Sequence, residues 1–425
     1  MSLAAQPRPF HNVENSAQIE IAPEPVHGGA LAPLREPLFR SLWIAAVISY
    51  TGSWMQNIAT GWLMTSLTSS PMWVSLVQVA LSLPVLIIAL PAGALADLVD
   101  RRKFLLITQS SMVAASMALG ILTITGTCTP TLLLILTFLL GAGAVMNDPA
   151  WQALTPDLVP VSKLAAAVAL NSAGFNIARA VGPALGGLVV ATAGSGAAFL
   201  LNAISFFGVI LFLYRWKPAP KETSLLKQTV TGAIGIGLRY TREEPRIKAV
   251  LVRTFAFSIC SSAFWALLPL IASRFGAEGY GAMLALFGLG ALVGALLLAR
   301  ARRSFSYDAV TASATVVFAV ALFGLVHTDG LIASSVFAAA AGLAWISMLA
   351  TLNLVAQIVC PGWIRARVIS MYVLVLQGGL AVGSVLWGAV ATHTSIRFTF
   401  TVAAALLVAG LGATPVFRLQ SSRNH

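Results

Sequence analysis

Apolar runs of about twenty residues recur along the whole chain, and they constrain its fold more than any other feature. A helix of about 20 residues spans the ~30 Å hydrocarbon core of a bilayer. Only 9% of the 425 residues are charged and 58% are hydrophobic, whereas soluble domains carry about 25% charged residues. The sequence therefore predicts an all-α integral membrane protein. The predicted spans, twelve in all, are 41–64, 72–95, 104–126, 131–155, 165–193, 197–214, 249–273, 280–299, 308–327, 330–356, 364–391 and 396–417.

An internal repeat divides these spans into two sets of six. GALADLVDRRK starts at Gly93 and GALLLARARRS starts at Gly294, a spacing of 201 residues. At the same spacing Pro160 matches Pro361. Six is an even number, so both halves enter the membrane in the same direction, as parallel repeats do. We therefore expect two parallel six-helix repeats around a central cavity.

The predicted organisation follows from the repeat and from the polar segments around it. No apolar run marks a cleavable signal peptide near the start, and the proline-rich and glutamate-rich beginning is typical of disorder. We expect a disordered cytoplasmic tail at 1–40, an N-terminal bundle at 41–214, a cytoplasmic linker at 215–248, a C-terminal bundle at 249–417 and a cytoplasmic tail at 418–425.

The net charge of +12 is explained by membrane orientation rather than by nucleic acid. Most Lys and Arg fall in the tails and in every second loop, while Arg274 and Arg397 fall in the opposite loops. Positive residues collect on the cytoplasmic side of membrane proteins. The pattern therefore predicts that both termini are cytoplasmic and that the chain contacts lipid, not nucleic acid.

Several kinds of chemistry find no support in the sequence. It has no G-x-x-x-x-G-K-[ST] phosphate loop, and no His lies in the middle of a predicted span. Cys128, Cys260 and Cys360 fall in an outer loop, a span and an inner loop, without the spacing of metal ligands. We expect no enzyme activity, no metal and no cofactor.

The short loop after the second span carries charges close to a glycine. Gly93 allows helices to approach, and Asp97 lies at a helix end with Arg101 and Arg102 nearby. A carboxylate there can accept hydrogen bonds from a helix N-terminus and pair with an Arg, which would latch the two halves together in one state. The alternative is a basic anchor at the membrane surface.

A second motif, GFNIARAVGPALGG at 174–187, lies in the fifth span. Its small residues and its proline form a thin helix face suited to close packing and bending. Ordinary helix packing is the alternative interpretation. The residues of this motif are Gly174, Gly182, Pro183, Gly186 and Gly187.

Both motifs resemble signature segments of the major facilitator superfamily, and the second resembles the packing motif of its antiporters. LVPVSKLAAAVALNSAGFNIARAVGPALGG and PGWIRARVISMYVLVLQGGLAVGSVLWG extend the resemblance to the branch that holds the enterobactin exporter and the macrolide efflux proteins. The chain departs from the pattern at Leu98, Asp100 and Ala178, and it has Thr137 where drug–proton antiporters usually have an arginine.

The resemblance implies a monomeric secondary transporter of the bacterial inner membrane. The leading hypothesis is a proton-coupled exporter of a small amphiphilic, siderophore-like or drug-like compound, working by alternating access. A metabolite importer or uniporter and a lipid flippase of the same fold are the alternatives.

Two charges lie deep in the predicted spans, Asp148 in span four and Arg179 in span five. Ionisable residues at such depth are expensive and mark functional sites by default. One interpretation is a buried Asp148–Arg179 pair. Another is a helix broken at Asn147-Asp148-Pro149, with Asp148 as the N-cap of a second piece. A third is a carboxylate that faces the cavity and carries protons.

Other polar and aromatic residues are candidates for lining the cavity. A lining of amides and aromatic rings suits an amphiphilic substrate, although interhelical hydrogen bonds would explain the same residue types. The candidates are Trp54, Gln56, Asn57, Trp151, Gln152, Asn171, Asn176, Trp265, Asn353 and Gln357.

Overall fold

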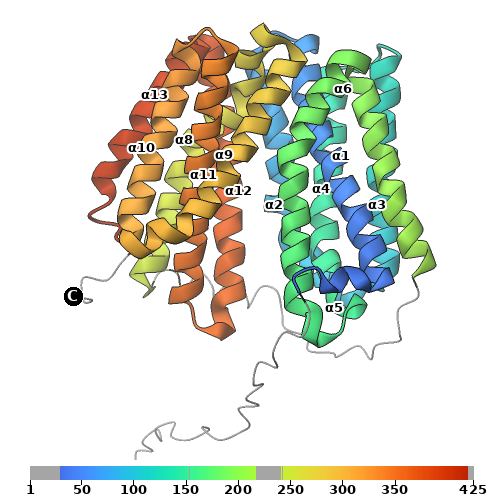
Figure 1. Cartoon of the computed structure of the whole chain (residues 1–425). Helices are drawn as coiled ribbons and strands as arrows, with labels where there is room; N and C mark the ends of the chain where they lie inside the picture. Colours follow the sequence, from blue (N-terminus) through green and yellow to red (C-terminus); the bar gives the residue numbers. More distant parts are fainter. Residues whose placement is uncertain (1–28, 153, 217–240, 242, 420–425) are drawn as a thin grey trace, which may run out of the picture.

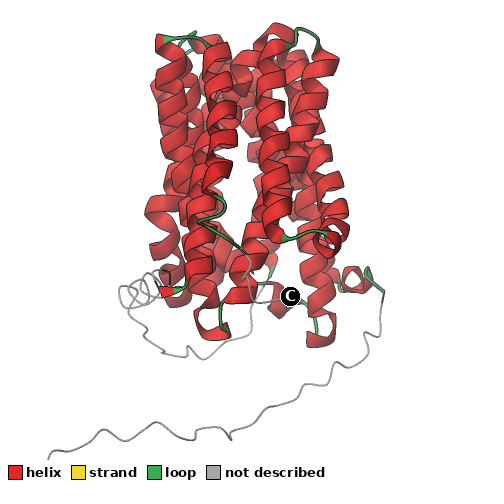
Figure 2. Ribbon diagram, turned by 90° about the vertical axis from the view of Figure 1, so that its left-hand side faces the viewer, coloured by secondary structure: helices red, strands yellow, loops and turns green. Residues whose placement is uncertain are grey.

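The computed structural model describes residues 29–152, 154–216, 241 and 243–419, without the side chains of residues 90–98, 149 and 363. Among these residues the regular structure is helical throughout, with no strand. The long helices run side by side along one axis (Figure 2). Nine segments of the described part are long and apolar enough to cross a membrane. Two of them, Val161–Arg215 and Pro245–Ser304, have 55 and 60 residues, which is enough for two crossings each.

The first group of helices lies on one side of the molecule (Figure 1). α6 has 52 residues, but at Gly194 the backbone leaves helical geometry with φ 81° and ψ 166°. Because a positive φ is strained for any residue with a Cβ, glycine makes this sharp reversal possible. The group consists of α1 (Pro37–Leu67), α2 (Pro71–Leu98), α3 (Arg101–Ile124), α4 (Pro130–Gln152), α5 (Thr155–Leu158) and α6 (Leu164–Arg215).

The second group lies beside the first and repeats its pattern of short connections. Its helix starts are set by the sequence: the Oγ atoms of Ser306 and Ser395 accept hydrogen bonds from the backbone N–H of Ala309 and Phe398, both at 3.1 Å. The group consists of α8 (Pro245–Ala272), α9 (Gly276–Ser304), α10 (Tyr307–His327), α11 (Leu331–Val359), α12 (Gly362–His393) and α13 (Ile396–Gly410).

The end of α4 corrects one of the sequence interpretations. Helix α4 continues through Asn147 and Asp148 to Gln152, so Asp148 is not the N-cap of a second helical piece. The chain leaves the helix only after Gln152, and the short α5 follows at Thr155. A proline within a transmembrane helix is tolerated because neighbouring groups satisfy the freed carbonyl. Asp148 therefore projects from the side of a continuous helix.

The two groups touch through glycines in the half of the spans away from the linker. A Cβ at Gly187 on α6 would lie 2.8 Å from the Cα of Gly281 on α9, and a Cβ at Gly388 on α12 would lie 2.8 Å from the Cβ of Ser75 on α2. Neither glycine could carry a side chain without a shift. Toward the ends that carry α5 and the N-terminus of α12, the ribbons of the two groups splay apart (Figure 1). We call the end of the molecule at Trp216 and Pro245 the linker end.

Candidate functional site

A cavity of about 260 Å³ opens inside the first group of helices. It lies between α1, α3, α4 and α6. Asp148 is the only charged side chain among the described residues that line it. The lining residues are Ala46, Ser49, Tyr50, Ser53, Trp54, Asn57, Gln109, Met112, Ala144, Asn147, Asp148, Trp151, Phe175, Phe206 and Val209.

Aromatic rings form one wall of this cavity. The ring centroids of Tyr50 and Phe175 lie 5.5 Å apart, those of Trp54 and Phe175 6.4 Å, and those of Tyr50 and Trp151 6.5 Å, all edge to face. Tyr50, Trp54 and Asn57 recur at helical spacing, so they share one face of α1. Edge-to-face pairs leave some ring faces free, and these faces are electron-rich.

The position of Asp148 is fixed by its neighbour in sequence. The Oδ1 atom of Asn147 accepts a hydrogen bond from Nε2 of Gln109 at 3.1 Å, which ties α4 to α3. The Oε1 atom of Gln109 is buried and has no partner among the described residues. The side chain of Asp148 is exposed in the cavity. The site thus offers the carboxylate of Asp148 as an accessible acceptor, whereas the amide oxygen of Gln109 lies beneath the cavity surface.

The predicted Asp148–Arg179 pair does not form: no ion pair joins these two described residues. The guanidinium of Arg179 lies 5.8 Å from the ring centroids of both Trp54 on α1 and Phe287 on α9. Its Nε atom is buried without a hydrogen-bond partner in the described part of the chain. Cations are attracted to aromatic faces at this range. Arg179 thus joins the two helix groups, while Asp148 faces the cavity alone.

The other predicted lining residues are placed in several different ways. Trp54, Asn57 and Trp151 line the cavity, whereas Gln56 is buried between helices, where its Oε1 accepts a hydrogen bond from Ser116 at 2.7 Å and another from Asn202. Trp265 packs against other aromatic rings of the second group, with its centroid 4.9 Å from that of Phe287.

The remaining predicted lining residues do not contact this cavity. Asn171 donates to Thr155 at 3.0 Å, and Asn176 donates to the carbonyl of Ser172 at 2.8 Å. Asn353 and Gln357 bond to each other on α11, and Gln152 is exposed near the end of α4.

Sequence reasoning did not single out Tyr50, Phe175 or Gln109 as lining residues. Tyr50 could have been found from its helical spacing with Trp54 and Asn57. Phe175 and Gln109 gave no such signal, because their role depends on how α3 and α6 pack around α1.

The predicted latch is described only in part. Gly93 and Asp97 lie in the part of α2 of which only the backbone is described, so the contacts of the Asp97 side chain lie outside the described part of the structure. Arg102 donates from Nε to the carbonyl of Leu213 at 2.7 Å and from Nη2 to that of Tyr214 at 2.6 Å. A cation suits the carbonyl-rich C-terminus of a helix. Arg102 therefore holds the start of α3 to the end of α6, and Arg101 lies beside it at the helix start.

The glycines of the second motif face two different helices. A Cβ at Gly186 would lie 2.8 Å from the Cα of Met55 on α1, and one at Gly187 would lie 2.8 Å from the Cα of Gly281 on α9. A Cβ at Gly182 would also meet α1, and one at Gly174 would lie 2.8 Å from a methyl group of Val47. Pro183 is buried, and a Cβ at Gly281 would lie 2.8 Å from its carbonyl oxygen. The motif thus packs α6 against its own group and against the other group at once.

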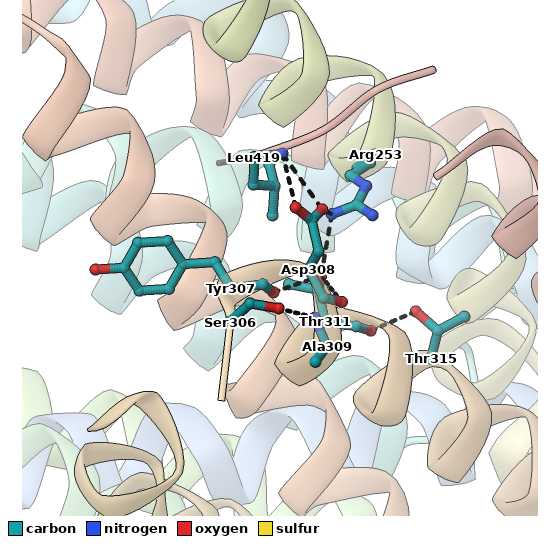
Figure 3. A network of polar contacts seen from close by, with 8 residues as sticks. All are labelled: Arg253, Ser306, Tyr307, Asp308, Ala309, Thr311, Thr315 and Leu419. Atoms are coloured by element: carbon teal, nitrogen blue, oxygen red, sulfur yellow. Dashed lines mark hydrogen bonds and ion pairs between the residues drawn. The ribbon is translucent and has the colours of Figure 1, made fainter. Parts of the chain in front are cut away.

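An ionic cluster joins α8 and α10 of the other group (Figure 3). Nη1 of Arg253 on α8 lies 2.8 Å from Oδ1 of Asp308 on α10 and 3.1 Å from Oγ1 of Thr311. Both carboxylate oxygens of Asp308 also accept from the backbone N–H of Leu419, at 3.3 and 3.2 Å. This aspartate is therefore occupied by partners, and its cluster ties α8, α10 and the chain after α13 together.

The fold and the cavity define a membrane transporter built of two repeated bundles, and comparisons with known proteins agree. The family model described as transmembrane secretion effector matches residues 28–425. The chain therefore belongs to this family, whose members are transporters of the major facilitator superfamily.

Relatives with names are transporters of several kinds of compound. The chain is 27% identical to the multidrug efflux pump Tap of Mycolicibacterium fortuitum, over 90% of this chain and 96% of that one. It is 24% identical to the staphyloferrin A transporter of Staphylococcus aureus, over 66% and 72% of the two chains. Macrolide efflux protein A of Streptococcus pyogenes is 26% identical over 36% of this chain and 37% of its own.

Solved structures share the fold at low identity. The nucleoside transporter NupG superposes with a TM-score of 0.70 at 14% identity, over 89% of this chain and 98% of that one. A bacterial homologue of the human lysosomal transporter Spinster, inward-facing and unoccupied, superposes with a TM-score of 0.72 at 12% identity, over 92% and 99%. These likenesses establish the architecture of a major facilitator transporter.

Proposed function

We propose that the protein is a proton-coupled exporter of small amphiphilic compounds, siderophore-like or drug-like, in the bacterial cytoplasmic membrane. The observation that carries the proposal is the cavity in the first group of helices, lined by aromatic rings and by the carboxylate of Asp148, which pairs with no cation in the described part of the chain. An acid at membrane depth without a cationic partner among the described residues is costly, and by default it indicates a functional site. The names of the efflux relatives supply the direction of transport.

In the proposed cycle, the two bundles rock against each other, and this movement opens the cavity of the first bundle to one side of the membrane and then to the other. The glycine contact between Gly187 and Gly281 closes the end away from the linker, and the groups splay at the linker end (Figure 1). With the linker and both termini in the cytoplasm, as the basic loops favour, this arrangement is the inward-facing state. Substrate enters it from the cytoplasm or the inner leaflet.

Asp148 has the proposed role of exchanging proton for substrate. A carboxylate that is deprotonated when substrate is bound, and protonated on the return, couples one movement to the other. Arg179 is proposed to stabilise the closed end through Trp54 and Phe287, since it reaches across both bundles. Gly93, Asp97, Arg101 and Arg102 are proposed as the latch of the opposite state. The bundle boundaries predicted from the sequence, and function as a monomer, belong to the same proposal.

The test is transport by the purified full chain in proteoliposomes. An internal pH-sensitive dye reports proton movement while siderophores, macrolides and other amphiphiles are added one at a time. We expect at least one compound to drive proton movement that a protonophore abolishes and that liposomes without protein do not show. Substrate uptake without proton movement would contradict the coupling and favour a uniporter. No movement of any compound would contradict export of this class.

A further inference from the structure

We infer that the substrate of this cavity is an organic cation with a flat aromatic or apolar body, and that its charge binds at Asp148. The inference rests on the proposed function and narrows it from amphiphiles in general to one charge class. Three features of the cavity support the inference: its aromatic wall, the carboxylate of Asp148, and the lack of a cationic side chain among the described lining residues.

The first argument is the balance of charge in the lining. Asp148 carries the only formal charge among the described lining residues, and no described cation pairs with it. A substrate that brings a cation neutralises this carboxylate. An anionic substrate would place two like charges together, which is costly in a low dielectric.

The second argument is the geometry of the rings. Tyr50 lies edge to face with both Phe175 and Trp151, with centroids 5.5 and 6.5 Å apart. Rings set at steep angles around a space offer faces from more than one direction, and aromatic faces attract cations. Trp151 is one helical turn from Asp148 on α4, so the carboxylate and this part of the aromatic wall act on the same end of a ligand.

Arg179 fixes which end of the cavity receives the charge. Its guanidinium lies 5.8 Å from the centroid of Trp54, so the chain already places a cation of its own beside that ring. A second cation there would be repelled, whereas no described cation lines the cavity at Asp148. The cationic head therefore lies between Asp148, Tyr50 and Trp151. The apolar body extends toward Met112 and Phe206, which also line the cavity.

The experiment uses three probes of one shape and different charge. They are 1-methyl-4-phenylpyridinium, the neutral 4-phenylpyridine and the anionic biphenyl-4-carboxylate. Their binding to the purified full chain in detergent is measured by displacement of radiolabelled 1-methyl-4-phenylpyridinium at matched free concentrations. We expect the cation to bind about tenfold or more tightly than the neutral probe, and the anion to bind least.

The matched variants are Asp148→Asn and Asp308→Asn, one aspartate in each bundle. We expect Asp148→Asn to lower the affinity for the cation about tenfold and to change that for the neutral probe less than about threefold. Asp308→Asn changes neither, because Asp308 is held by Arg253 and the N–H of Leu419. Equal binding of the three probes by the unaltered protein, or tighter binding of the anion, would overturn the inference whatever the variants do.

The outcomes separate this inference from the proposed function. If cations bind with the expected preference but no cation is carried in proteoliposomes, export fails while the charge class of the site stands. If neutral or anionic compounds are exported and the cation has no advantage in binding, export stands and the inference is overturned.

Discussion

The two bundles have a similar arrangement of helices, but the side chains inside them differ in polarity. In the first bundle a cavity with a carboxylate and amides lies beside α1. In the second bundle the helices enclose a cluster of aromatic rings with centroids 4.9 to 6.3 Å apart. The cluster consists of Phe257, Phe264, Trp265, Phe287, Phe318 and Trp345. The first bundle therefore presents a carboxylate and amides to a cavity, whereas the aromatic rings of the second bundle pack against one another.

The internal repeat shows where this difference arises. Glu36-Pro37 before α1 and Glu244-Pro245 before α8 are 208 residues apart, and at this spacing polar residues of α1 correspond to aromatic residues of α8. The pairs are Ser49 with Phe257, Gln56 with Phe264, and Asn57 with Trp265. At the spacing of 201, Asp148 meets Leu349 and Arg179 meets Leu380. The repeat preserves glycines and loops but not charge, so a repeated fold need not have a repeated site.

The largest expected effect is a loss of protein stability when the aromatic cluster of the second bundle is truncated. Trp345→Ala removes a buried ring that lies 5.4 Å from Trp265 and 5.8 Å from Phe257, and such truncations cost about 3–5 kcal/mol. We expect a marked fall in the midpoint of thermal unfolding in detergent. Trp151→Ala, on the half-buried wall of the cavity, is the control, with a loss of binding and little loss of stability. Equal destabilisation by both would show that the two bundles do not differ in this way.

An intermediate effect is expected where the bundles meet. Gly187→Ala places a Cβ 2.8 Å from the Cα of Gly281 and from the carbonyl oxygen of Ala277, and overpacking of this kind costs about 1–3 kcal/mol. The contact should open, which lengthens the distance between spin labels at Thr127 and Thr394, one in each bundle. These labels would be placed by cysteine substitution after the three native cysteines are replaced by serine.

The control for this distance measurement lies on the same helix. A Cβ at Gly208 would meet the Cβ of Ala45 at 3.7 Å, an ordinary contact, so Gly208→Ala should leave the distance unchanged. An unchanged distance in Gly187→Ala as well would mean that this glycine contact does not hold the end of the transporter closed.

The smallest effect is expected at the ionic cluster of the second bundle. Asp308→Asn removes the charge that pairs with Arg253, whose side chain is 11% exposed. The asparagine keeps an oxygen that can still accept a hydrogen bond, so we expect a loss of about 1 kcal/mol. We expect a small fall in the unfolding midpoint and unchanged transport. A transport defect as large as that of a cavity variant would show that the second bundle takes part in coupling, which contradicts the proposal.

The sequence was sufficient for the broad architecture. The lengths of the apolar runs and the break between the predicted spans 165–193 and 197–214, where the chain reverses at Gly194, are local features, and local features are readable from sequence. The nine apolar segments match predicted spans, two of them as pairs, and α1 lies where span one was expected. The count of twelve spans stays a prediction.

The site was less predictable because it depends on rotation of helices about their axes. Arg179 and Asp148 lie deep in consecutive predicted spans, which suggested an ion pair. In the structure Arg179 turns toward Trp54 and Phe287 instead. The sequence around Pro149 suggested a broken helix, but tertiary packing carries α4 past it to Gln152. The spacing of residues in the sequence predicted where the helices lie, but it did not predict the directions in which these side chains point.

The central claim is that Asp148, and no other described aspartate within a bundle, couples substrate to protons. The most direct measurement compares proton movement driven by a transported compound in proteoliposomes of Asp148→Asn and of Asp308→Asn. Asparagine keeps the size of the side chain but cannot titrate. The account predicts that Asp148→Asn still binds a neutral probe but moves no protons, while Asp308→Asn moves them as the unaltered protein does. Proton movement preserved in Asp148→Asn would contradict it.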